Sequence, residues 1–422
     1  MDISIIAIGD ELLIGQVVDT NSGDIARHIA PEGWTVADVQ VVADKPEAIR
    51  EAIERAFSRS KVVLTTGGLG PTKDDITKQV MCDIFGGQLR EDPAVLANVK
   101  EVVAKRGLRL NDLTAAQAIV PTSCKVIQNR VGTAPLMWFE SDGKVLVAMP
   151  GVPFETREMF ATDVFPMLLQ RFPSDMAVAH RTLIVTDISE SLLATRLESW
   201  ESALPSWAHL AYLPKPGIIR LRIDGRMANA GLLSEEMDRL VNELAALCGD
   251  NLLALGDLTP ARILLDELIA RKLTVATAES CTGGNIAHTI TSEAGSSASM
   301  LGGVVSYSNS VKRSLLGVTE ESLSAHGAVS RDVVTQMALG ACRATGADVA
   351  MATSGIAGPG GAVEGKPVGT VWMAIAYKEH VYTELFHFPG DRSRVIDRAT
   401  TMALIRTIQL LRGKIQANSH YF

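Results

Sequence analysis

The chain has 422 residues, 47% of them apolar and 21% charged, which is long enough for two or three folded domains. Its net charge of −8 and its lack of a Lys/Arg cluster argue against a nucleic-acid partner, because binding a phosphate backbone requires a concentrated basic surface. It also has no apolar run near the roughly 20 residues that span a bilayer and no secretory signal pattern. We therefore expect a cytoplasmic protein without a membrane partner.

The first segment alternates short β-branched runs with helical patterns. Strand patterns cover residues 3–8, 35–42, 61–66 and 145–149. Helical patterns cover residues 21–30, 46–58, 75–85, 93–106 and 153–170. This alternation is typical of βαβ units, so it predicts a mostly parallel sheet with helices on both faces.

The middle of the chain differs, and the alternation then resumes. Strand patterns at 180–186 and 218–223, helical patterns and several prolines indicate a small α+β domain. From residue 258 onward, short strand runs again alternate with helical patterns, ending in a long helix at 391–412. The predicted fold class is α/β, with two α/β domains whose sheets are mostly parallel, joined by the small α+β domain. The predicted domains cover residues 1–172, 173–256 and 257–415.

A glycine-rich stretch follows the strand pattern at 61–66. It contains Gly67, Gly68 and Gly70, with Asp74 and Asp75 behind them. The carboxyl end of a parallel strand is where such sheets bind ligands, and the glycines allow a backbone concavity for phosphate. The two carboxylates are oxygen ligands suited to Mg²⁺. The alternative is a plain turn followed by an aspartate that caps a helix.

A second set of polar residues lies in the last domain. The loop at 278–284 follows a strand pattern and carries Ser280 and Cys281, which are rival nucleophiles. Neighbouring side chains on extended backbone point in opposite directions, so only one of the two is expected to face a pocket. Tyr307 stands at a strand end, and Lys312 follows about one helical turn later. A lysine with a lowered pKa can activate a hydroxyl nucleophile, although a helix cap and a solvated lysine are the simpler alternatives.

Five motifs, taken together, resemble the CinA family of competence/damage-inducible proteins, and the resemblance covers essentially the whole chain. The motifs are Gly-Asp-Glu-Leu-Leu-Ile-Gly at 9–15, Thr-Thr-Gly-Gly-Leu-Gly-Pro-Thr-Lys-Asp-Asp at 65–75, Pro-Gly-Val-Pro-Phe-Glu at 150–155, Ala-Glu-Ser-Cys-Thr-Gly-Gly at 278–284 and Thr-Ser-Gly-Ile-Ala-Gly-Pro at 353–359.

The resemblance implies two activities on pyridine-nucleotide metabolites. It implies a molybdopterin-binding-like first domain associated with ADP-ribose pyrophosphatase activity, which would use a divalent metal such as Mg²⁺. It implies a last domain that is a nicotinamide-nucleotide amidase, which needs no cofactor and converts nicotinamide mononucleotide and water to nicotinate mononucleotide and ammonia. The expected partners are these small nucleotides and a second copy of the chain, in a homodimer.

The resemblance also implies roles for individual residues. Ser280 is the expected nucleophile or water-orienting group, with Lys312 taking its proton directly or through Tyr307 and with nearby backbone N–H groups stabilising the oxyanion. Cys281 is expected to fill space. The expected substrate-binding residues are Glu279, Thr282, Gly283, Asn309, Ser354, Gly355 and Arg392, of which Arg392 would hold the phosphate. In the first domain, nucleotide binding is expected from Glu11, Gly67, Gly68, Gly70 and Asn129, and metal binding from Asp74 and Asp75.

Three departures from the family pattern limit these expectations. Leu136 stands where the family usually has glycine, and Ala116 stands where it has a basic residue, which weakens the case for pyrophosphatase activity. Ile396 replaces an expected arginine near the last helix. The resemblance leaves two alternatives open, a molybdopterin- or nucleotide-binding protein and a competence-related interaction protein, each without amidase activity.

Overall fold

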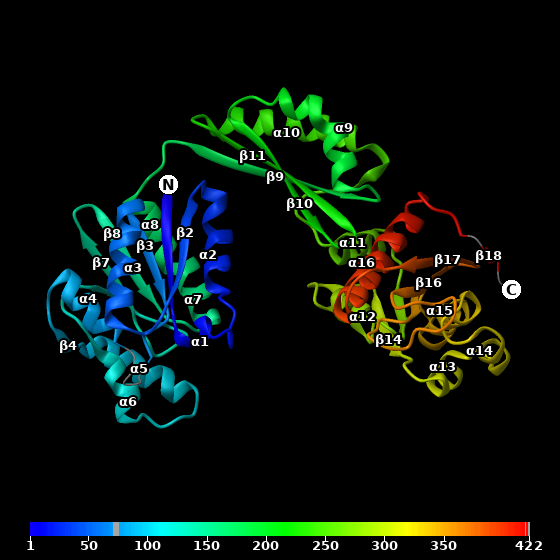
Figure 1. Cartoon of the computed structure of the whole chain (residues 1–422), viewed down its shortest axis with the longest axis horizontal. Coiled ribbons are helices and arrows are strands. Elements are labelled where there is room, and N and C mark those ends of the chain that lie inside the picture. Colours follow the sequence, from blue (N-terminus) through cyan, green and yellow to red (C-terminus); the bar gives the residue numbers. More distant parts are fainter. Residues whose placement is uncertain (71–75, 418, 421–422) are drawn as a thin grey trace. The chain divides into compact units, whose positions relative to one another are not determined.

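The computed structural model describes residues 1–70, 76–417 and 419–420, and the chain forms two compact units. Unit 1 comprises Met1–His180 and Asp224–Met237, and unit 2 comprises Arg181–Ile223 and Asp238–Phe422 (Figure 1). The segment predicted as a separate connecting domain is thus shared between the two units, and the three-domain division stays a prediction. None of the helices in the described ranges is long and apolar enough to cross a membrane.

The first sheet has the strand order β2-β1-β3-β8-β7-β6. Its parallel part contains β2 (Thr35–Val42), β1 (Asp2–Ile8), β3 (Val62–Thr66) and β8 (Lys144–Met149). Its antiparallel part adds β7 (Leu136–Ser141) and β6 (Lys125–Ile127), which the sequence patterns did not predict. β7 and β8 are joined by a tight turn at Asp142 and Gly143, both with positive φ, so no helix separates them.

Alternate residues of β1 enter two different apolar cores, one on each face of this sheet. Ile3 and Ile5 pack with α2 (Asn21–Ile29) and α8 (Phe165–Arg171), whereas Ile6 and Ile8 pack with α3 (Pro46–Arg59) and α4 (Thr77–Phe85). Burial on both faces is typical of parallel strands between helical layers. The helix predicted over 153–170 is instead α7 (Pro153–Met159), a π-helical turn (Phe160–Val164) and α8. α5 (Pro93–Lys105) forms a smaller apolar cluster with Ala118.

The middle of the chain folds as a sheet with the order β10-β11-β9-β12 and two helices. These elements are β9 (Ala177–Thr186), α9 (Glu190–Ser202), β10 (Ala208–Lys215), β11 (Ile218–Met227), α10 (Ala230–Cys248) and β12 (Leu252–Leu255). β10 and β12 were not predicted from the sequence.

The last sheet has the order β14-β13-β15-β16-β17-β18. β14 (Met300–Val305), β13 (Val275–Glu279) and β15 (Val349–Gly355) are parallel. The strands β16 (Thr370–Tyr377), β17 (His380–His387) and β18 (Ser419–His420) continue it in antiparallel order. The carboxyl ends of β13, β14 and β15 therefore lie at one edge, where a sheet of this kind presents its ligand site.

Helices cover both faces of the last sheet (Figure 1). Val275 of β13 packs toward α11 (Pro260–Arg271), α12 (Asn285–Thr291) and α16 (Arg392–Leu411). Ala276 and Ala278 pack toward α15 (Arg331–Thr345) and the end of α13 (Asn309–Leu316), with α14 (Glu320–His326) beside them. Because β13 ends at Glu279, Ser280 lies at the carboxyl edge of the sheet.

Candidate active site

Ser280 and Lys312 are in direct contact at the carboxyl edge of the last sheet. Lys312 lies in α13 and is only 1% exposed, so the solvated position that we weighed for it is wrong. Its Nζ donates hydrogen bonds to Ser280 Oγ at 3.0 Å, to the Ser306 carbonyl at 2.7 Å and to the Tyr307 carbonyl at 3.3 Å. Ser280 itself is partly exposed.

The surroundings of Lys312 favour its neutral form. Its three hydrogen-bond partners are neutral oxygens, and burial lowers the pKa of the lysine ammonium. A larger share of the amine is then uncharged near neutral pH, and the uncharged amine is the form that can accept a proton from Ser280. Tyr307 contacts Lys312 through its carbonyl rather than its phenol, so this geometry favours direct proton transfer.

The side chain of Cys281 is buried in an apolar cluster. It is 5% exposed and packs with Ala357, Val371, Val395 and Ala399, and Ile396 packs against the same cluster. Burial raises the pKa of the thiol to about 12. The thiolate is therefore scarce at neutral pH, and Cys281 has the position of a space-filling residue rather than a nucleophile.

The structure corrects the predicted substrate contact of Glu279. Its side chain is completely buried. One carboxylate oxygen accepts hydrogen bonds from the Thr282 hydroxyl at 2.7 Å and from the N–H groups of Gly284 and Ile286 at 3.0 Å each. The other accepts the Ala287 N–H at 2.9 Å. Glu279 thus satisfies the first N–H groups of α12, which are therefore not free to bind an anionic group of the substrate.

Thr282 and Ser354, both predicted to bind substrate, have buried side chains. The Thr282 hydroxyl donates to Glu279 and lies 2.7 Å from Thr353 Oγ1, while the Ser354 hydroxyl donates to the Ala328 carbonyl at 2.7 Å. Both side chains therefore stabilise the loops of the site from inside. Within the described ranges, the Thr282 N–H forms no hydrogen bond, which makes it a candidate oxyanion donor.

The remaining predicted residues lie at the outer rim of the site. Tyr307 is 64% exposed, and its hydroxyl accepts a hydrogen bond from Arg392 Nη2 at 3.1 Å. Arg392 also donates through Nη1 to the Gly358 carbonyl at 2.8 Å. Gly283 and Asn309 are exposed, and Gly355 ends β15. The rim is thus polar and carries the guanidinium of Arg392.

In the first domain, the structure describes Gly67, Gly68 and Gly70 but neither Asp74 nor Asp75, which lie outside the described residues. Gly67 and Gly68 have φ values of +94° and +65°. A Cβ atom at Gly67 would lie 2.1 Å from the Ile8 carbonyl oxygen, so only glycine allows this approach of two strand ends. Glu11 lies in the short helix Asp10–Leu13 that follows β1.

Asn129, which we predicted to bind nucleotide, has a side chain that is hydrogen-bonded inside the protein. It is completely buried, and its amide oxygen accepts the N–H groups of Val131 and Gly132 at 3.0 and 2.8 Å. Its amide nitrogen donates to the Ala134 carbonyl and to Glu155, both at 2.9 Å. Asn129 therefore holds a loop and orients Glu155, whose carboxyl pKa is raised by burial.

The sequence reasoning missed three polar side chains in the first domain, two of which lie near the glycine loop. Buried atoms of Asn21, Ser22 and Thr77 (Oδ1, Oγ and Oγ1) have no hydrogen-bond partner in the described part of the chain. Thr77 faces Gly68, and Asn21 donates to the Gly151 carbonyl at 2.9 Å. The only sequence signal was an Asn-Ser pair at a helix start, which we interpreted as part of the helix alone.

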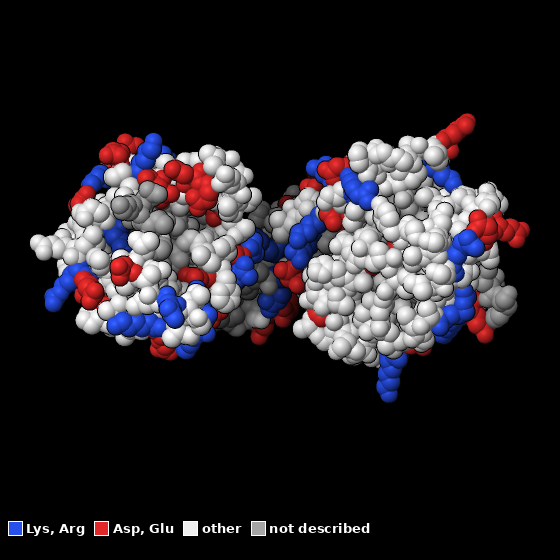
Figure 2. Space-filling view, turned by 90° about the horizontal axis from the view of Figure 1, so that it is seen from below, with Lys and Arg blue, Asp and Glu red and all other residues white. Residues whose placement is uncertain are grey.

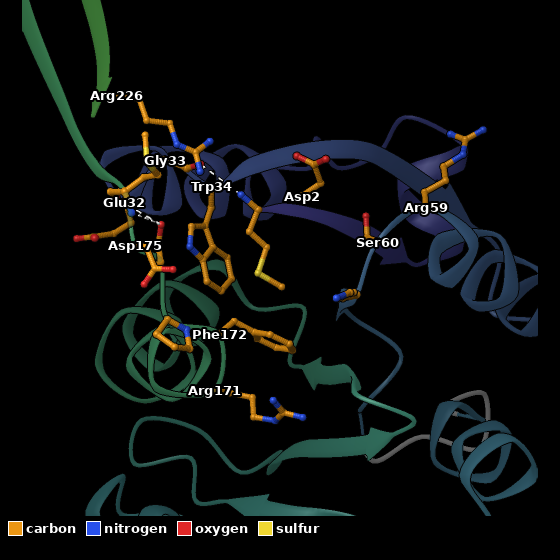
Figure 3. Close-up of a pocket in the computed structure, with 15 residues that line it drawn as sticks. Asp2, Glu32, Gly33, Trp34, Arg59, Ser60, Arg171, Phe172, Asp175 and Arg226 are labelled. Carbon is orange, nitrogen blue, oxygen red and sulfur yellow. Dashed lines mark hydrogen bonds between the residues drawn. The ribbon is translucent and has the colours of Figure 1, made fainter. Parts of the chain in front are cut away.

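No cluster of metal ligands marks another site in the described residues. Residues 1–70, 76–417 and 419–420 contain no group of three His, Cys, Asp or Glu side chains that could hold a metal ion. On the face seen in Figure 2, basic residues are interspersed with acidic ones. A cavity of about 700 Å³ in unit 1 lies near the amino ends of β1 and β3, lined by charges of both signs that include Asp2, Arg59 and Arg226 (Figure 3). None of the predicted site residues lines this cavity.

Comparison with known proteins identifies both halves of the chain. Residues 4–170 match the family model described as a probable molybdopterin binding domain, and residues 258–411 match the CinA C-terminal domain. The chain is 38% identical to a CinA-like protein of Flavobacterium psychrophilum, over 96% of this chain and 97% of that protein. It is also 38% identical to a putative competence-damage inducible protein of Caldicellulosiruptor saccharolyticus, over 95% and 97% of the two chains.

Among solved structures, a CinA superfamily protein from Klebsiella pneumoniae is 38% identical, with a TM-score of 0.36, and covers 36% of this chain and 96% of its own. The two nearly full-length relatives and the match to the CinA C-terminal domain indicate the same family, and the second matched model describes the domain that precedes it. The chain therefore belongs to the CinA family, with a molybdopterin-binding-like domain preceding a CinA C-terminal domain.

Proposed function

We propose that the C-terminal domain is an amidase that hydrolyses nicotinamide mononucleotide to nicotinate mononucleotide and ammonia. The observation that supports this most directly is the 3.0 Å contact between Ser280 Oγ and the buried Nζ of Lys312. A hydroxyl next to a lysine with a lowered pKa is a nucleophile and base pair suited to acyl transfer. The resemblance to the family supplies the substrate.

The reaction proceeds in two acyl-transfer steps. Neutral Lys312 takes the Ser280 proton while Ser280 Oγ attacks the carboxamide carbon, and the carbonyl electron pair moves to an oxyanion that the Thr282 N–H stabilises. The C–N bond then breaks, Lys312 returns the proton to the leaving nitrogen, and ammonia departs from a Ser280 ester. Water attacks the ester with Lys312 again accepting a proton, which returns to Ser280 as the nicotinate product leaves.

Arg392 is the group that we assign to the substrate's phosphate. It lies at the exposed rim beside Tyr307, and a guanidinium recognises phosphate through paired hydrogen bonds. The N-terminus of α12 does not serve this purpose, because Glu279 already accepts its N–H groups.

The experiment is to incubate the purified full chain with nicotinamide mononucleotide and to measure ammonia and nicotinate mononucleotide. We expect equal amounts of the two products, and a lower kcat/KM for nicotinamide riboside, which lacks the phosphate. Ser280→Ala is the matched control. Ammonia release by the wild type that does not exceed release by this variant would reject the amidase and favour a binding or interaction protein.

For the first domain, we propose metal-dependent hydrolysis of ADP-ribose to AMP and ribose 5-phosphate. The glycine loop and the unpaired hydroxyl of Thr77, which faces Gly68, support a site for a phosphorylated ligand. Asp74 and Asp75 are the proposed metal ligands. AMP formation is expected to require a divalent metal and to be lost in Asp75→Ala; activity that survives this substitution would contradict the assignment, and saturable molybdopterin binding without AMP formation would favour the binding alternative.

A further inference from the structure

We propose that Glu279 is a positioning residue for the nucleophile, and that its carboxylate shapes the loop of residues 280–284 from inside the protein. The inference rests on the proposed amidase function and extends it to a residue that touches neither substrate nor Lys312. The buried carboxylate of Glu279, which lies directly before Ser280 in the chain, is thereby expected to affect kcat.

The hydrogen bonds of this loop converge on the Glu279 carboxylate. After Ser280 the chain turns, and it returns to Glu279 through the Thr282 hydroxyl and through the N–H groups of Gly284, Ile286 and Ala287. Four donors converge on one side chain, so the turn and the first turn of α12 are fixed together. A charged acceptor makes such hydrogen bonds stronger than a neutral one.

The other end of the loop is anchored to β15. The Ser280 N–H donates to the Thr353 carbonyl at 3.0 Å, and the hydroxyls of Thr282 and Thr353 are 2.7 Å apart. Ser280 is thus held on both sides, by β15 and by the carboxylate, while its hydroxyl meets Lys312. A displacement of about 1 Å at a reacting atom can cost roughly 100-fold in rate, so loosening this loop should reduce turnover.

The negative charge of Glu279 also excludes the N-terminus of α12 as the binding site for the substrate's phosphate. A free helix N-terminus attracts anions, but here an internal anion occupies it. Substrate affinity should therefore be independent of Glu279, in contrast to the direct contact that the sequence suggested. A positioning role predicts a change in kcat, and a binding role predicts a change in KM.

The test compares Glu279→Gln and Glu279→Ala with the full-length wild type. The glutamine oxygen can still accept three of the four hydrogen bonds, whereas alanine accepts none. We expect kcat for nicotinamide mononucleotide to fall about tenfold in Glu279→Gln and about 100-fold or more in Glu279→Ala, with KM changed less than about threefold. Glu321→Gln removes an exposed carboxylate of the same type and should behave as wild type.

Amide hydrogen exchange of residues 280–287 provides a readout that needs no substrate. Exchange should be faster than wild type in Glu279→Gln and faster again in Glu279→Ala. If Glu279→Ala does not fold, the kcat and the exchange rate of Glu279→Gln alone test the proposal. A KM more than about tenfold higher with unchanged kcat in Glu279→Gln, or wild-type kcat and exchange in that variant, would overturn the proposal. A wild type without ammonia release would reject the amidase instead, and the exchange rates would still decide whether the carboxylate holds the loop.

Discussion

Ser280 and Cys281 are neighbours in the chain, yet their side chains lie in opposite environments. Ser280 Oγ meets Lys312, whereas the Cys281 thiol packs in an apolar cluster with Val371 and Val395. Both residues follow the end of β13, Ser280 in a bend and Cys281 in a turn, and the burial of each side chain decides which one can react.

The two residues should therefore respond very differently to substitution by alanine. Ser280→Ala should reduce kcat for nicotinamide mononucleotide by about 10⁴-fold or more, because it removes the nucleophile. Cys281→Ala should keep most of the turnover and lower the free energy of unfolding by about 1 kcal/mol, because it leaves a small cavity. Ammonia assays and urea unfolding measure the two effects. The reverse pattern in kcat would assign the nucleophile to Cys281.

The buried Lys312 should make both activity and stability depend on pH. Its pKa is lower in the folded chain than in the unfolded one, so between these two values the unfolded state binds more protons. The free energy of unfolding should then rise with pH through this window, and Lys312→Met should lack that rise. Urea unfolding over a pH series measures the difference, and parallel curves for the two proteins would contradict it.

The same residue should set the pH profile of the reaction. In the wild type, kcat/KM should increase with pH as Lys312 loses its proton and should level off above its folded-state pKa. The midpoint should lie below the value of about 10.4 for an ordinary lysine. A midpoint at or above that value would exclude Lys312 as the base.

At the scale of elements, the position of Lys312 depends on the packing of α13 against α15. Gly340 of α15 faces the end of α13, where a Cβ atom would lie 2.0 Å from the Leu316 carbonyl oxygen. Glycine is thus required here by the close approach of two helices, although it lowers helix propensity.

Gly340→Ala should destabilise the protein, against the expectation from helix propensity. Propensity alone favours alanine by about 1 kcal/mol, but overpacking two backbones costs roughly 1–3 kcal/mol, and the resulting shift of α13 should also lower kcat. Gly231→Ala in α10 is the matched control, because a Cβ atom there meets only the Asn229 side chain at 3.4 Å. Urea unfolding measures both, and a stabilised Gly340→Ala would show that the helices can separate without cost.

At the scale of the whole molecule, Arg406 joins distant parts of unit 2. It extends from α16 and pairs with Glu384 of β17 at 2.7 Å and with Asp187, just after β9, at 2.8 Å. Gln409 donates to the same Asp187 at 2.6 Å. This network links the segment after β9 to the last sheet within one compact unit.

Arg406→Met should lower the free energy of unfolding by roughly 2–3 kcal/mol. Removing one partner of a buried ion pair typically costs about 3–5 kcal/mol, and the partial exposure of Asp187 and Glu384 reduces that cost. Arg313→Met, which breaks an exposed pair with Glu320, should change it by less than about 1 kcal/mol. Tryptophan fluorescence during urea unfolding measures both, and equal midpoints for the two variants would contradict the role of Arg406.

Much of the fold could be predicted because strands and helices leave local periodic patterns. The parallel strands and most long helices matched their predicted positions within a few residues, as at β2, β8 and α3. The antiparallel strands β6, β7, β10 and β12 did not. Several are short, and their pairing depends on hairpins and distant partners rather than on an alternation with helices.

The sequence by itself determined the α/β alternation, the loops at strand ends and the residue types that can react, because each of these depends on a few residues that are adjacent in the chain. Only the tertiary structure decided that Lys312 is buried against Ser280, that Cys281 faces an apolar cluster and that the Glu279 carboxylate accepts hydrogen bonds from its own loop. Burial and hydrogen bonding at these positions are set by Thr353, Val371, Val395 and other residues far along the chain. The reactivity of a side chain therefore follows from neighbours that only folding brings together.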